Sequence, residues 1–238
     1  MNDRRWDIRV LRQYIRNTDF EEERKMRLVQ AADSIGVSFN RFYWYHRDQF
    51  DAALDELRRH MQTGGIMAAL RFMLSQSKEQ EKCDLAVAAL QANSVAAMHV
   101  LRSSVDMYAQ LENGLSSSEP LSPDRCDIAS LYRQRERLSA EGRDRVATIV
   151  GSAPYSYVNA FVNIAKHRHL IQTPQSLERD AAGDQHVYGI YADAFSYRNA
   201  HFPRRPLGEL FTTMDELIAL ILEAAVGLNQ SLGLDSSP

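Results

Sequence analysis

Residues 79–112 read EQEKCDLAVAALQANSVAAMHVLRSSVDMYAQLE, and this stretch decides the fold. Apolar and small residues recur in it at alternating steps of three and four, which is the spacing of one buried face of an α-helix. The alanines around that face allow neighbouring helices to approach closely, so we expect the central helix of a bundle. The predicted buried stripe consists of Cys83, Val87, Leu90, Ser94, Ala97, Leu101, Val105, Tyr108 and Leu111.

Helical patterns also precede the central helix. Residues 5–16 place Val10, Leu11, Tyr14 and Ile15 on one face and arginines on the other, which indicates an amphipathic helix. A second helix is expected to start at a capping box of Thr18 and Glu21 and to end near Gly36. A third is expected to start at a cap at Ser38 and to end at Gly64 and Gly65, and a short apolar helix should follow at 66–74.

After the central helix the pattern is less regular. A solvated loop is expected at 114–123, and residues 173–205 lack helical periodicity, although VYGIYADAF at 187–195 can form a short strand. One later helix is expected to start at Ser122-Pro123-Asp124, and another, over 152–168, at Ser152. The terminal helix is expected to start at a capping box of Thr213 and Glu216. Its predicted buried face consists of Met214, Leu217, Ile218, Ile221, Ala225 and Leu228.

The predicted fold class is therefore all-α. We expect a helical bundle with a long central helix and an irregular segment, with room for a short strand, before the C-terminal helix. Residues 1–238 are expected to form a single helical domain, in which 1–75 supply N-terminal helices and 79–238 form the core bundle that carries the motifs.

Composition narrows the class of protein. The chain has 28 basic and 31 acidic residues and a formal charge of −3, so nucleic acid could be attracted only by a local patch. Its two cysteines show no CxxC spacing, which argues against a disulfide framework or a structural zinc site. The start has no signal-peptide pattern, and the longest aliphatic run, 217–222, is too short to span a bilayer. We expect a soluble cytoplasmic protein without a membrane partner or a cofactor.

Polar residues interrupt two of the predicted helices. His99, Arg102 and Asp106 share one face of the central helix close to its buried stripe. If the two helices are neighbours, this set can meet a second one near the end of the 152–168 helix. The second set consists of Asn163, Lys166 and His167.

The two segments that carry these sets form a recognisable pair. HVLRSSVDMYAQL at 99–111 and APYSYVNAFVNIAKHRHLI at 153–171 resemble a group of uncharacterised, mainly bacterial proteins with paired HxxLRSxxD and NxxKHR motifs. The resemblance covers about a third of the chain. The matching residues are His99, Leu101, Arg102, Ser103, Asp106, Pro154, Tyr155, Asn163, Lys166, His167 and Arg168.

That group is similar to the HEPN class of helical bundles, many of which are metal-independent ribonucleases of toxin–antitoxin and phage-defence systems. The resemblance implies a metal-independent endoribonuclease whose partners are RNA and a cognate protein. The mark of the class is an arginine followed a few residues later by a histidine, but here Met107 stands five residues after Arg102. Two other pairs approximate that spacing, Arg41 with His46 and Arg179 with His186.

A site of this kind needs a base and a cation. A histidine takes the proton of a ribose 2′-hydroxyl, and arginine or lysine stabilises the charge that builds on the phosphate, so RNA is the substrate. The predicted catalytic residues are His167, Arg102 and Lys166, with His99 or Asp106 orienting the imidazole, and the predicted binding residues are Asn163, Arg168 and His169.

Two alternatives accompany this site. A metal site would use His167, His169 and Asp106, and it requires the helix to end between the two histidines. In the structural alternative, Arg102 and Asp106 form an i,i+4 ion pair that holds Asn163 or the end of its helix. The protein is then a non-catalytic helical interaction or regulatory protein. In either case we expect a homo-oligomer.

Overall fold

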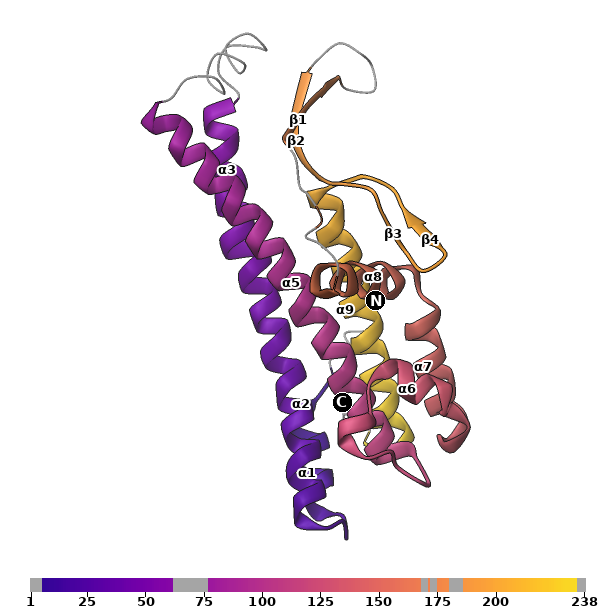
Figure 1. Cartoon of the computed structure of the whole chain (residues 1–238). Helices are drawn as coiled ribbons and strands as arrows, with labels where there is room; N and C mark the ends of the chain where they lie inside the picture. The colour runs from indigo at the N-terminus through magenta and orange to yellow at the C-terminus, as the bar shows by residue number, and fades with distance from the viewer. Residues whose placement is uncertain (1–5, 62–76, 168–170, 172–174, 180–185, 235–238) are drawn as a thin grey trace. The chain divides into compact units, whose positions relative to one another are not determined.

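The fold is known from a computed structural model, which describes residues 6–61, 77–167, 171, 175–179 and 186–234. It is predominantly helical, which confirms the predicted fold class (Figure 1). The helices are α1 (Ile8–Asn17), α2 (Glu22–Tyr43), the π-helix η1 (Trp44–Phe50), α3 (Asp51–Met61), α5 (Lys78–Ser116), the 3₁₀ turn η2 (Pro123–Arg125), α6 (Ile128–Arg133), the 3₁₀ turn η3 (Arg135–Arg137), α7 (Ala140–Gly151), α8 (Ala153–His167) and α9 (Leu207–Ser231).

The chain forms two compact units. The first consists of Met1–Asn40, Val100–Asn159 and Met214–Pro238, and the second of Arg41–His99 and Ala160–Thr213. The chain passes from one unit to the other within α2, α5, α8 and α9. Each unit is therefore assembled from segments that lie far apart in the sequence.

The central helix α5 has the predicted buried stripe. All nine residues of the stripe are buried, and the most exposed of them, Val87, is only 6% exposed. The helix runs to Ser116, beyond the predicted end, because its last carbonyls have partners. Arg24 donates to the carbonyl of Gly114 at 2.6 Å, and the amide of Ser139 donates to the carbonyl of Ser116 at 3.0 Å.

Gly36 does not end α2, and Ser38 does not start another helix, so these two predictions are wrong. An added Cβ at Gly36 would stand 3.2 Å from Cδ1 of Ile8, so the glycine allows α1 to pack closely on α2. The helix continues because its apolar stripe continues, with Ile35 and Phe39 both buried. The predicted end at residues 64 and 65 and the predicted helix at 66–74 lie outside the described residues.

The helix starts predicted from the two threonine capping boxes are also wrong. Thr18 ends α1, where its hydroxyl donates to the carbonyl of Ile15 at 2.7 Å, and α2 begins only at Glu22. Thr213 lies inside α9, and its hydroxyl donates to the carbonyl of Glu209 at 3.0 Å. A threonine hydroxyl can bond to a preceding carbonyl of its own helix, so the residue type alone does not mark a helix start.

Two other predicted helix starts have different outcomes. Ser152 caps α8 as predicted, and its hydroxyl accepts a hydrogen bond from the amide of Tyr155 at 3.2 Å. Pro123 opens only the single turn η2, and the following helix α6 is capped instead by Asp127, which accepts from the amide of Ser130 at 2.6 Å.

The irregular segment before α9 contains strands. They are β1 (Gln175–Arg179), β2 (His186–Ala192), β3 (Phe195–Tyr197), β4 (Ala200–Phe202) and β5 (Arg205–Pro206). They form an antiparallel sheet in the order β1-β2-β5 and a β3-β4 hairpin. β2 confirms the strand predicted in residues 187–195. In the hairpin, Phe195 stacks on Phe202 at 4.9 Å and meets Phe161 of α8 edge-on at 6.0 Å.

One described helix, α5, is long and apolar enough to cross a membrane by length and composition alone. This is weak support for a membrane span, because the core helix of a soluble protein passes the same test, and 39% of the apolar window is buried in the protein. The absence of a membrane partner therefore stays a prediction.

Replacing Gly114 with alanine should lower the free energy of unfolding by about 1–3 kcal/mol, although alanine is the better helix former. The new Cβ would overlap the side chain of Leu28, which is buried on α2. Urea denaturation measures the change. Gly151→Ala is the control, because a Cβ there meets nothing within 4 Å. Equal stability of the two variants would contradict this account of the packing.

Candidate functional site

Arg102 lies at the centre of a polar cluster that joins α5 to α8. Its guanidinium forms an ion pair with Asp106 one turn later, at 2.5 Å, which confirms the predicted i,i+4 pair. Its Nε donates to the side-chain oxygen of Asn159 at 3.1 Å, and its guanidinium lies 5.7 Å from the ring centre of Tyr155. The Arg102 side chain is 14% exposed, so these contacts enclose most of it.

Asp106 extends the same cluster to α6. Its Oδ1 accepts a hydrogen bond from the amide of Ile128, the first residue of α6, at 3.1 Å. Nearby, the thiol of Cys126 donates to the carbonyl of Ala109 at 3.6 Å. Burial, with smaller contributions from Asp127 and Asp106, raises the pKa of Cys126 to about 12. The thiol is therefore protonated at neutral pH and offers no thiolate nucleophile.

His99 belongs to the second unit, together with Lys166 at the end of α8. Burial lowers the pKa of His99, and the positive charge of Lys166 lowers it further. The imidazole is therefore neutral at neutral pH. A neutral histidine beside a cation could accept a proton next to a bound anion.

The remaining predicted site residues are divided between described and undescribed parts of the chain. Asn163 is half-buried on α8, whereas Lys166 and His167 are exposed in its last turn. Arg168 and His169 lie outside the described residues. Among the residues that the structure describes, no three His, Cys, Asp or Glu side chains are grouped so that they could hold a metal ion.

The two other arginine–histidine pairs lie in different surroundings. His46 is in η1, and its ring stacks on Phe211 with centroids 4.3 Å apart and planes 10° apart, so it packs within an aromatic cluster. Arg179 and His186 are backbone partners at the ends of β1 and β2. Both residues therefore belong to strands.

A second polar cluster, which the sequence analysis did not identify, lies further along α5. Glu112 has no exposed surface, and Arg145 of α7 binds both of its carboxylate oxygens, at 2.9 and 2.8 Å. The phenol of Tyr108 donates to the same carboxylate at 2.6 Å. Burial, and then the charge of Glu112, raises the pKa of Tyr108 well above its ordinary value, so the phenol keeps its proton.

The sequence held a signal for the two missed residues, Asn159 and Glu112, although not for the pairing of Glu112 with Arg145. Asn159 lies one turn before Asn163 on α8 and shares its face, and Glu112 lies one turn after Tyr108, where the buried stripe of α5 continues. Extending each helical face by one turn would therefore have found Asn159 and Glu112.

Replacing Arg145 with alanine should lower the free energy of unfolding by about 3–5 kcal/mol, because the carboxylate of Glu112 would remain buried without a cation. Arg143→Ala on the same helix is the matched control. Arg143 forms an exposed ion pair with Glu136 at 3.0 Å, and such pairs contribute about 0–1 kcal/mol. Chemical denaturation measures both, and similar losses would contradict the assigned role of Arg145.

Replacing Lys166 with methionine should raise the pKa of His99, since it removes a positive charge that opposes protonation. An NMR titration of the imidazole measures the pKa, with Lys25→Met as the control in the other unit. A pKa of His99 that is unchanged in Lys166→Met would contradict the proximity of the two residues.

The lowered pKa of His99 makes the free energy of unfolding depend on pH. The unfolded chain binds the proton of His99 more readily than the folded protein does. The contribution of His99 to stability is therefore complete above its unfolded pKa of about 6.5 and is lost as the pH falls from there through the lower folded value.

Comparisons with protein-family models, with curated proteins and with solved structures give no match.

Proposed function

We propose that this protein is a non-catalytic helical interaction or regulatory protein, in which Arg102, Asp106 and Asn159 fasten α5 to α6 and α8. The observation that carries the proposal is the state of Arg102. Its guanidinium is largely enclosed, paired with Asp106 and bonded to Asn159. An arginine that stabilises a phosphate during cleavage must present its N–H groups to the substrate, whereas Nε of Arg102 is bonded to Asn159 and its Nη1 is paired with Asp106.

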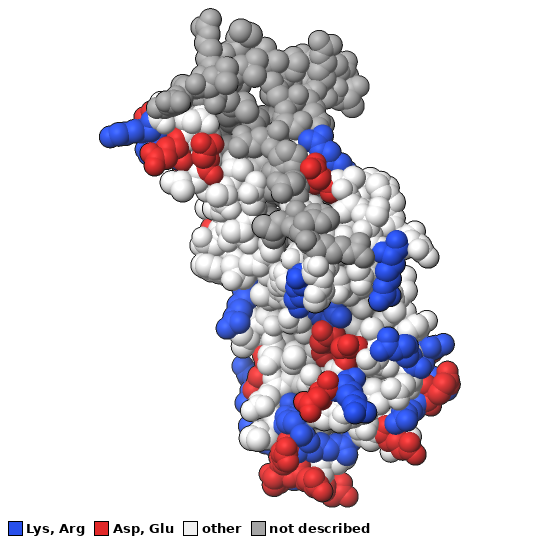
Figure 2. Space-filling view, viewed as in Figure 1, with Lys and Arg blue, Asp and Glu red and all other residues white. Residues whose placement is uncertain are grey.

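Two further observations support the structural role. Asp106 also bonds to the first amide of α6, so it holds a helix start in addition to its ion pair. On the face of the molecule in Figure 2, basic and acidic side chains of the described residues lie next to one another and form no continuous positive surface. A continuous positive surface would strengthen binding to a nucleic acid backbone.

A second candidate is a HEPN-like ribonuclease in a phage-defence or toxin–antitoxin setting. It is favoured by His99, a neutral imidazole near Lys166, since this pair has the chemistry to take the proton of a 2′-hydroxyl and to bind the adjacent phosphate. His167, in the turn that carries Lys166, is the alternative base. A cognate protein partner and a homo-oligomer are part of both proposals.

An assay on single-stranded RNA with divalent metals chelated separates the two candidates. We expect no cleavage above the protein-free control by the wild-type protein. Chelator-resistant cleavage that is lost in His99→Ala or His167→Ala, with an unchanged helical circular dichroism spectrum, would establish the ribonuclease and overturn the proposal.

Replacing Arg102 with alanine should lower the free energy of unfolding by about 1–3 kcal/mol, because Asp106 and Asn159 lose a largely buried partner. Arg27→Ala is the matched control. Arg27 and Glu23 form an i,i+4 pair on α2 at 3.0 Å, but both side chains are exposed, so its loss should cost about 0–1 kcal/mol. If Arg102→Ala is no less stable than Arg27→Ala, Arg102 does not fasten the helices.

A further inference from the structure

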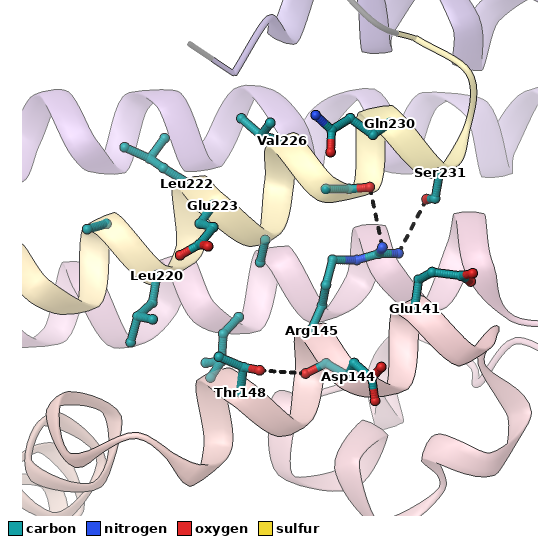
Figure 3. Close-up of a pocket in the computed structure, with 14 residues that line it drawn as sticks. Glu141, Asp144, Arg145, Thr148, Leu220, Leu222, Glu223, Val226, Gln230 and Ser231 are labelled. Atoms are coloured by element: carbon teal, nitrogen blue, oxygen red, sulfur yellow. Dashed lines mark hydrogen bonds between the residues drawn. The ribbon is translucent and has the colours of Figure 1, made fainter. Parts of the chain in front are cut away.

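A groove of about 1010 Å³ runs between α7 and α9 in the first unit (Figure 3). The close-up shows side chains of α7 on one side and of α9 on the other. Much of its lining is apolar, and it is supplied by Ile149, Ala219, Leu220, Leu222, Ala224 and Val226. A cavity of this size with such a lining favours a ligand with an apolar face.

The charged residues of the groove are mainly acidic. Glu141, Asp144 and Glu223 line it, and all three are exposed. Among the described residues that line the groove, Arg145 is the one basic residue, and the buried carboxylate of Glu112 balances its charge. The same guanidinium also donates to the carbonyl of Gly227 on α9 at 3.3 Å. Three carboxylates therefore line the groove with one guanidinium that Glu112 already neutralises, so the net charge of the lining is negative.

The walls of the groove determine the form of the ligand. Both walls are α-helices, whose backbone groups are already hydrogen-bonded, so they offer no strand edge for an extended peptide. A peptide bound there must satisfy its own backbone groups, which a helix does. The lining residues of α9 run from Ala219 to Ser231, which at the rise of an α-helix is about 18 Å. The groove therefore accommodates roughly three turns of a helix at ordinary helix-packing distance.

We propose that the α7–α9 groove binds an amphipathic helix of a partner protein, with lysine or arginine residues flanking the apolar stripe of that helix. The apolar stripe would lie on Leu220, Leu222 and Val226, and the basic residues would face Asp144 and Glu223. This inference rests on the proposed interaction function, since it names the surface and the class of partner.

The test uses two labelled peptides and fluorescence anisotropy with the full chain. Both peptides are designed helices with leucines spaced as i, i+3, i+4 and i+7, flanked by lysines in one and by glutamates in the other. The lysine peptide should bind about tenfold more tightly to the wild-type protein. That preference should shrink at high salt, because exposed charges are screened.

Charge reversal in the groove makes the test specific. In Asp144→Lys/Glu223→Lys the preference should invert, so that the glutamate peptide binds more tightly. Asp124→Lys, an exposed carboxylate of the same unit outside the groove, is the control and should keep the wild-type preference. Val226→Asp should weaken the binding of both peptides, because it places a charge on the apolar surface of the groove. Circular dichroism checks that each variant is folded.

Three results would overturn the proposal: binding of neither peptide, equal affinities that charge reversal does not alter, or self-association that Val226→Asp abolishes. The last would assign the groove to a second copy of the chain, and sedimentation velocity detects it. Failure of the groove is distinguishable from failure of the proposed function. The groove can fail while the protein leaves RNA intact, whereas the function fails if the protein cleaves RNA.

Discussion

The burial of one carboxylate requires three helices of the first unit to meet at one point. Glu112 lies in the buried stripe of α5, and a charge without exposed surface is tolerated only with a well-placed partner. Arg145 supplies it with two hydrogen bonds and also reaches the carbonyl of Gly227 on α9. One side chain thus fixes α5, α7 and α9 together. Of the described residues that line the groove between α7 and α9, only Arg145 is basic, and Glu112 neutralises it. The remaining charge of the groove lining is therefore negative.

The helical faces could be predicted from the sequence because burial repeats with the helix period. The stripes of α5 and α9 are buried at every predicted position, from Cys83 to Leu111 and from Met214 to Leu228. The ends of the helices were harder to predict, because several side chains fit two roles. Thr18 and Thr213 bond to carbonyls of their own helices, and Gly36 provides space for Ile8 rather than a left-handed turn. Tertiary packing decides between those roles, and a single sequence does not reveal it.

The candidate site was predictable only within one helix. Arg102 and Asp106 are one turn apart, so their ion pair follows from helical geometry alone. Contacts to other helices depend on the rotation of those helices about their axes. Arg102 bonds to Asn159, where the motif had indicated Asn163 one turn later. The pairing of Glu112 with Arg145, 33 positions away, has no local signal at all.

A double-mutant cycle on Arg102 and Asp106 tests most directly whether the motif residues of α5 are structural. The free energies of unfolding of Arg102→Ala, Asp106→Ala and the double variant give the coupling of the pair, and the separate bond of Asp106 to Ile128 cancels in the cycle. A structural pair should give a favourable coupling of about 1–2 kcal/mol. A coupling near zero would contradict a structural role for the pair. Single variants that are more stable than the wild-type protein would also contradict it, since residues retained for activity are often held at a cost in stability.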